Sequence, residues 1–153
     1  MATPLSSVLP STARATPDGG RLRGIRVLLV EDHEDTRELM AMGLESEGAN
    51  VSQADSVRSA ISAAASDDFD ILLTDLGMPG EDGYGLLRRL RAGEPNAKAR
   101  QLPAVAVTAF AAREDRLKAL AAGFQDHLAK PFDMLSLVDL VARLAGRGGK
   151  AIS

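Results

Sequence analysis

The residues best suited to chemistry in this sequence are polar side chains that directly follow short apolar runs. Three are carboxylates, one is a hydroxyl and one is an ammonium group. Carboxylates gathered in one place repel one another and favour a bound cation. Their oxygens suit Mg²⁺, which binds proteins through one or two carboxylates and keeps several waters. The set consists of Glu31 and Asp32 after residues 25–30, Asp75 after residues 71–74, Thr108 after residues 102–107, and Lys130 after residues 126–129.

This set of groups predicts the transfer of a phosphoryl group to a carboxylate. Asp75 stands at the end of a buried-type strand, where an acid has no obvious structural role other than to cap the next turn or helix. A cation held by the acids would draw a phosphoryl donor to Asp75, and Thr108 and Lys130 could hold the phosphoryl oxygens. Catalysis at such a site rests on positioning and charge neutralisation.

The elements that must position these groups alternate between strands and helices. Continuous apolar runs suit strands buried on both faces of a parallel sheet, whereas residues 49–54 alternate as an edge strand does. Five strands alternating with five helices predict a doubly wound α/β fold with helices on both faces of the sheet. Right-handed crossovers favour the strand order 2-1-3-4-5, which gathers the ends of strands 1, 3, 4 and 5 on one rim.

The expected boundaries follow from apolar spacing, capping residues and glycines. The expected strands are 25–30, 49–54, 71–75, 102–108 and 126–130, and the expected helices begin near residues 35, 57, 84, 113 and 134, with a polar loop at 94–101. The residues expected to form the apolar faces of the first and last helices are Leu39, Met40, Met42 and Leu44, and Leu135, Val138, Leu140, Val141 and Leu144.

Composition bounds the class of protein. The 153 residues fit one domain at 23–146, preceded by a disordered tail or linker at 1–22 and followed by a short tail at 147–153. A net charge of -3 argues against binding to nucleic acid, and the absence of cysteine excludes disulfides and thiolate metal sites. No apolar run reaches the roughly 18 residues of a membrane span. We therefore expect a cytoplasmic protein.

Four motifs occur in order, each at the end of an expected strand. They are Val-Leu-Leu-Val-Glu-Asp at 27–32, Leu-Leu-Thr-Asp-Leu-Gly-Met-Pro-Gly at 72–80, Val-Thr-Ala at 107–109 and Lys-Pro at 130–131. With these motifs, residues 24–146 resemble the receiver domain of bacterial two-component response regulators, which has a flavodoxin-like fold. The resemblance implies that Asp75 accepts a phosphoryl group from a histidine kinase or a histidine phosphotransfer protein. A downstream effector, which the sequence does not identify, would read the change.

The resemblance also implies roles for the residues around Asp75. Asp32, Asp75 and the backbone carbonyl of Gly77 would bind Mg²⁺ (or Mn²⁺) directly, and Glu31 would act through a metal-bound water. Thr108 and Lys130 would bind the phosphoryl group. The bond between Lys130 and Pro131 is expected to be cis, as it is in the family.

Two residues, His127 and Gly77, depart from the commonest family pattern. Phe110, like Gly77, bears on how long the phosphoryl group lasts. His127 stands where the family usually has an aromatic switch residue, so it is either a packed strand histidine or a switch. Gly77 has no side chain with which to orient a hydrolytic water, and Phe110 can screen the phosphoryl group with an apolar ring. We therefore predict slow self-dephosphorylation compared with receivers that carry polar side chains at both positions. Phosphorylation should draw Thr108 toward Asp75 and shift the following loop with Phe110, so Thr108, His127 and Phe110 are the candidate switch residues.

Other interpretations stand beside this one. The chain could be a stand-alone receiver or the receiver part of a hybrid histidine kinase, and two copies could pair through the last two helices. An aspartyl-phosphate phosphatase of the dehalogenase type would need an acid at Gly77, and an adaptor that is never phosphorylated would not need the intact set of site residues. We expect a signalling domain rather than an enzyme. His33, next to the acidic pair, is interpreted as a surface residue rather than a ligand.

Overall fold

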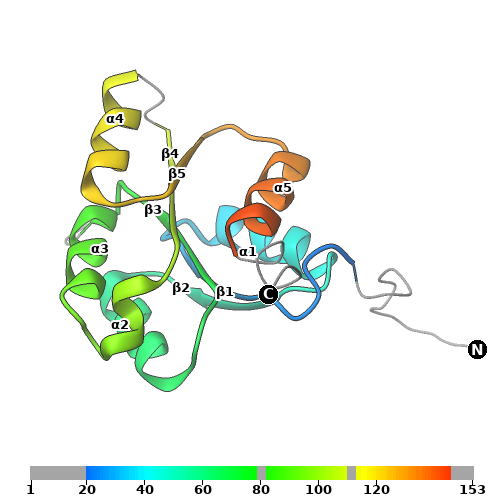
Figure 1. The fold of residues 1–153 in the computed structure, drawn as a ribbon. Helices are drawn as coiled ribbons and strands as arrows, with labels where there is room; N and C mark the ends of the chain where they lie inside the picture. Colours follow the sequence, from blue (N-terminus) through cyan, green and yellow to red (C-terminus); the bar gives the residue numbers. More distant parts are fainter. Residues whose placement is uncertain (1–19, 79–81, 110–112, 146–153) are drawn as a thin grey trace, which may run out of the picture.

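The computed structural model describes residues 20–78, 82–109 and 113–145, and these form one parallel sheet covered by helices (Figure 1). The strand order is β2-β1-β3-β4-β5, which confirms the predicted doubly wound α/β fold. All four neighbouring strand pairs are parallel. The strands are β1 (Arg26–Val30), β2 (Asn50–Ala54), β3 (Ile71–Asp75), β4 (Ala104–Thr108) and β5 (Asp126–Ala129).

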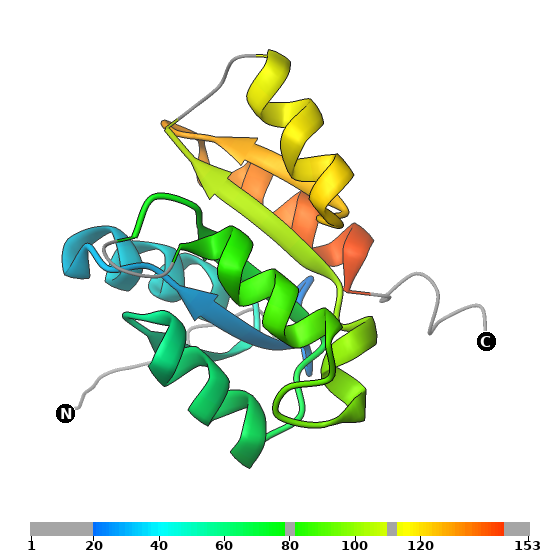
Figure 2. The same ribbon diagram turned by 90° about the vertical axis from the view of Figure 1, so that its left-hand side faces the viewer.

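Helices cover both faces of the sheet, with α1 and α5 on one side and α2, α3 and α4 on the other (Figures 1 and 2). Successive residues of each central strand point to opposite faces. Leu29 and Leu73 therefore pack in the cluster with α1 and α5, whereas Leu28 and Leu72 pack in the cluster with α2, α3 and α4. The helices are α1 (Glu34–Glu45), α2 (Val57–Ser66), α3 (Gly83–Arg91), α4 (Arg113–Ala122) and α5 (Met134–Leu144).

Polar caps fix where three of these helices begin. Ser56 caps α2 in a reciprocal capping box with Ser59. Asp82 caps α3 by accepting a hydrogen bond from Gly85 N at 2.9 Å. Asp133 caps α5 by accepting a hydrogen bond from Ser136 N at 2.7 Å. Among the residues that the structure describes, no helix is long and apolar enough to cross a membrane.

Several boundaries differ from the predictions. Leu22, which we assigned to the N-terminal tail, is fully buried in the core, and its backbone N–H donates to Glu47 O at 2.7 Å. Part of the expected loop at 94–101 is a 3-10 helix, η2 (Ala97–Gln101), capped by Asn96. Strand β4 begins at Ala104 rather than at residue 102. Residues 1–19 of the predicted N-terminal tail and the whole predicted tail at 147–153 lie outside the described residues.

Three apolar residues predicted to face the core are instead exposed. Leu39 and Met42 of α1 are 65% and 64% exposed, because Met40, Ala41 and Leu44 occupy the opposite, sheet-facing side of the helix. Leu135 at the start of α5 is 66% exposed. Helical spacing alone did not determine which of two apolar stripes faces the sheet.

Candidate functional site

The carboxyl ends of β1, β3, β4 and β5 lie along one rim of the sheet and carry the predicted polar residues. The parallel register aligns Asp75 with Val107, and Thr108 with Ala129, the residue before Lys130. Glu31 continues directly from β1, and its backbone N–H donates to Ala54 O at 3.0 Å. Ligands of open α/β sheets bind at this rim.

Asp75, the last residue of β3, is a buried acid at the centre of the rim. It is 7% exposed, and its Oδ1 accepts a hydrogen bond from Gly77 N at 3.3 Å. Lys130 Nζ lies 3.7 Å from the same oxygen. Burial raises the pKa of Asp75, and the negative charge of Glu31 raises it further, against the opposing effects of Gly77 N–H and Lys130.

Glu31 is paired with Lys130 more closely than Asp75 is. Its carboxylate is 1% exposed and accepts a hydrogen bond from Lys130 Nζ at 2.7 Å. Burial raises the pKa of Glu31, but the hydrogen bonds from Lys130 and His33 outweigh burial and leave that pKa lowered. The ammonium group of Lys130 therefore lies between two carboxylates. It is hydrogen-bonded to Glu31 and forms a longer ion pair with Asp75.

The strand ends place Lys130 and Thr108 together. The backbone N–H of Lys130 donates to Thr108 O at 2.7 Å, and the Lys130–Pro131 bond is cis, as expected. Thr108 is the last residue of β4 and is 1% exposed. A second cis bond, Glu94–Pro95, was not anticipated.

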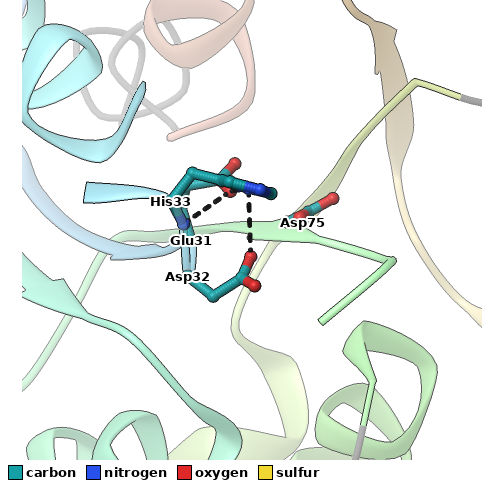
Figure 3. A group of neighbouring side chains, drawn as sticks. All are labelled: Glu31, Asp32, His33 and Asp75. Carbon is teal, nitrogen blue, oxygen red and sulfur yellow. Dashed lines mark hydrogen bonds and ion pairs between the residues drawn. The ribbon is translucent and has the colours of Figure 1, made fainter. Parts of the chain in front are cut away.

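The acidic residues form a group that could hold a metal ion (Figure 3). One ligand atom from each of Glu31, Asp32, His33 and Asp75 lies within 4.8 Å of the others. Among the buried side-chain nitrogen and oxygen atoms in the described part of the chain, Asp32 Oδ1 is the one without a hydrogen-bond partner. A buried carboxylate oxygen without a donor, beside two further carboxylates, fits the oxygen ligands that Mg²⁺ takes.

Two glycines near Asp75 serve different purposes. Gly77 is exposed, and a Cβ there would meet nothing within 4 Å, so the position is open above the site. At Gly83 a Cβ would lie 2.6 Å from the Asp75 carbonyl oxygen, so only glycine lets α3 begin this close to β3. The sequence pattern did not reveal this contact.

Sequence reasoning also missed the residue that holds the loop after β1. Arg37 of α1 donates from Nη1 to the carbonyl oxygen of Glu31 at 2.9 Å and from Nε to Gln53 Oε1 at 3.1 Å. Its position five residues after Asp32 was the available signal.

The structure does not decide the switch roles of His127 and Phe110. His127 lies in β5, partly buried and in register with Ala106, which does not decide between a packed strand histidine and a switch. Phe110 lies outside the described residues.

Comparison with known proteins identifies the family. Residues 27–142 match the response regulator receiver domain. The chain belongs to this family. This receiver is 43% identical over 115 residues to an uncharacterized 14.6 kDa protein of Leptolyngbya boryana, covering 75% of the chain and 86% of the relative. It is 33% identical over 140 residues to the sensor histidine kinase GacS of Pseudomonas protegens, covering 91% of the chain but 15% of the relative.

Other relatives and solved structures agree with this assignment. Among other curated relatives that it matches, the receiver spans 9% to 54% of their length. A solved structure with a TM-score of 0.72 and 34% identity is the receiver domain of the sensor histidine kinase PA1611 from Pseudomonas aeruginosa PAO1. The match covers 80% of this chain and 98% of that one, and that structure has a magnesium ion coordinated in its active-site cleft.

Proposed function

We propose that Asp75 accepts a phosphoryl group from the phosphohistidine of a histidine kinase or a histidine phosphotransfer protein. A carboxylate oxygen of Asp75 attacks phosphorus, the phosphorus–nitrogen bond breaks, and the donor imidazole keeps the bonding electrons. The observation that carries this proposal is the ammonium of Lys130 between two buried acids, 2.7 Å from Glu31 and 3.7 Å from Asp75.

The remaining residues of the rim complete the site. Lys130 compensates negative charge on the transferred group, and Glu31 fixes its ammonium in place. Thr108 offers a hydroxyl at the end of the neighbouring strand and is drawn toward Asp75 when the phosphoryl group is present. When bound, Mg²⁺ (or Mn²⁺) held by Asp32, Asp75 and the carbonyl of Gly77, with Glu31 acting through a water, would supply charge neutralisation.

The proposed role is a cytoplasmic signalling step rather than turnover of a substrate. A dehalogenase-type phosphatase would need an acid where the exposed Gly77 stands, and an adaptor would not need Lys130 between two acids. A partner protein reads the phosphorylated surface. That partner can be a second copy of this chain, paired through α4 and α5, since Leu117 and Leu120 of α4 are exposed.

The same chemistry serves a stand-alone receiver or the receiver of a larger kinase. The chain covers most of one short relative and a small part of GacS, so the family includes both arrangements. All the proposed site residues lie between Glu31 and Lys130, and the site therefore does not depend on which arrangement applies.

The test uses a small acyl-phosphate donor with Mg²⁺ and intact-protein mass spectrometry. The wild-type protein should gain one phosphoryl group, and Asp75→Asn should gain none. Asp139→Asn, which alters an exposed acid of α5, is the matched control and should gain the group as wild type does. Modification of Asp75→Asn at the wild-type rate would overturn the proposal.

A further inference from the structure

His33 occupies a capping position without acting as a cap. It is the N-cap residue of α1, where Ser, Thr, Asp and Asn are preferred because their side chains accept a backbone hydrogen bond. Within the described chain the His33 side chain makes no such bond. The ring instead lies against the acids, with Nδ1 3.1 Å from Glu31 Oε2 and 3.4 Å from Asp32 Oδ1 (Figure 3).

The His33 ring lies at the mouth of the acidic group. Its side chain is 73% exposed, so one edge faces solvent while Nδ1 faces the carboxylates. The four ligand atoms lie within 4.8 Å of one another, close to the roughly 4–4.4 Å that separates opposite ligands of a small divalent ion. Asp32 Oδ1, the buried oxygen without a hydrogen bond, lies 3.4 Å from Nδ1, slightly farther than Glu31 Oε2.

We propose that His33 Nδ1 is a nitrogen ligand of the metal site and shifts its selectivity toward nitrogen-binding ions such as Co²⁺ and Zn²⁺ relative to Mg²⁺. The inference rests on the metal site of the proposed function and adds one ligand to it. Imidazole suits transition ions, whereas Mg²⁺ favours carboxylates, carbonyls and water. Coordination requires the lone pair of Nδ1, so in the metal-bound protein the ring hydrogen would reside on Nε2, at the solvent edge.

A purely positioning role for His33 makes different predictions. His33 could act only by donating hydrogen bonds to Glu31, in which case any side chain with a donor would replace it. Asparagine keeps a short polar side chain that can donate to Glu31, but it offers a metal ion oxygen rather than nitrogen. His33→Asn therefore separates the two roles.

The experiment measures dissociation constants for Mg²⁺ and for Co²⁺ by calorimetry, at about pH 7.5, where free imidazole is mostly neutral. In His33→Ala, the affinity for Co²⁺ should fall about tenfold or more, and the affinity for Mg²⁺ by no more than about twofold. His33→Asn should restore no Co²⁺ affinity. His127→Gln removes the other histidine of the chain and should leave both constants unchanged.

A spectrum of the wild-type protein tests the ligand directly and needs no variant. Titration with Zn²⁺ should move the ¹⁵N resonance of His33 Nδ1 to the position of a metal-bound imidazole nitrogen. An unmoved Nδ1 resonance at saturation, or equal losses of Mg²⁺ and Co²⁺ affinity in His33→Ala, would overturn the inference.

The variant Asp32→Ala separates this inference from the proposed metal site. If Asp32→Ala loses both ions while His33→Ala changes neither, the metal site stands and the role of His33 fails. If Asp32→Ala binds both ions as wild type does, the metal site itself fails, and the inference about His33 fails with it.

Discussion

At the scale of single residues, the proposed phosphoacceptor, Asp75, carries an electrostatic cost in the metal-free protein. Asp75 is buried beside Glu31, and among the described residues Lys130 and the Gly77 N–H oppose the repulsion. The pKa of Asp75 is raised, so its ionised form is less stable in the folded chain than in the unfolded chain. The ionised carboxylate of Asp75 therefore weakens the fold at neutral pH.

Replacing Asp75 by asparagine should stabilise the metal-free protein. Asn keeps the shape of the side chain and carries no charge, so the free energy of unfolding should rise near neutral pH. Because the folded-state pKa is raised, the wild type recovers this stability as the pH falls and Asp75 is protonated, and the advantage of Asp75→Asn should vanish in acid.

Urea titrations of both proteins across this pH range give the difference directly. A difference that stays constant with pH, or a less stable variant at neutral pH, would contradict the electrostatic cause. Asp139→Asn, at an exposed acid of α5, should show no comparable gain.

The lifetime of the phosphoryl group should depend on Gly77. A Cβ at this position meets nothing within 4 Å, so asparagine can be accommodated without strain. Its amide could orient an attacking water, which glycine cannot do, and we predict severalfold faster self-dephosphorylation in Gly77→Asn. The prediction from the sequence also involves Phe110, so Gly77→Asn combined with Phe110→Glu should be faster still.

The measurement is a hydrolysis time course of the phosphorylated proteins after removal of the donor. Gly77→Ala, which adds only a methyl group, is the control and should keep the slow wild-type rate. Should the double variant hydrolyse no faster than wild type, these two positions do not control access of water.

The site residues divide into those that sequence could predict and those that it could not. Asp75, Thr108 and Lys130 were predictable because each follows an apolar run, and parallel strands bring such ends together. His33 and Arg37 were not assigned their contacts, because these depend on how the start of α1 turns over the acids. The spacing between Asp32 and Arg37 was available, but it does not by itself determine how α1 is turned relative to the acids.

At the scale of elements, the sheet was predictable and the helix faces were less so. Strands buried on both faces require continuous apolar residues, and the order of β1 to β5 follows from crossover handedness. In α1, two apolar stripes were available, and packing against the sheet selected the one with Met40 and Leu44. The short helix η2 has no apolar periodicity, so its residues were predicted to be a loop.

The start of α3 approaches Asp75 closely. In Gly83→Ala, the new Cβ would lie 2.6 Å from Asp75 O, so the helix or the strand end has to move. We expect a loss of about 1–3 kcal/mol in the free energy of unfolding, typical of overpacking, despite the higher helix propensity of alanine.

Gly77→Ala is the matched control for this change, because it adds the same Cβ atom at a position where no other atom lies within 4 Å. Urea denaturation of both variants tests the contact. Equal stabilities would mean that α3 can withdraw from β3 without cost.

At the scale of the whole molecule, the acids connect ion binding to the stability of the sheet. Glu31 and Asp32 follow β1, whereas Asp75 is the last residue of β3. Strands β1 and β3 are neighbours in the sheet. An ion held between their ends binds only when the strands are paired, because the unfolded chain does not bring these acids together. Binding at this rim should therefore stabilise the molecule as a unit.

Mg²⁺ should raise the free energy of unfolding by mass action, by about 2.7 kcal/mol at a hundredfold excess over the dissociation constant. Thermal or urea unfolding across a Mg²⁺ titration measures the gain, and Asp32→Ala should remove most of it. Asp139→Ala, which removes an exposed acid of α5, should retain it. An equal gain in Asp32→Ala would mean that the ion stabilises the protein elsewhere, and the link between the acids at the strand ends and the stability of the sheet would be lost.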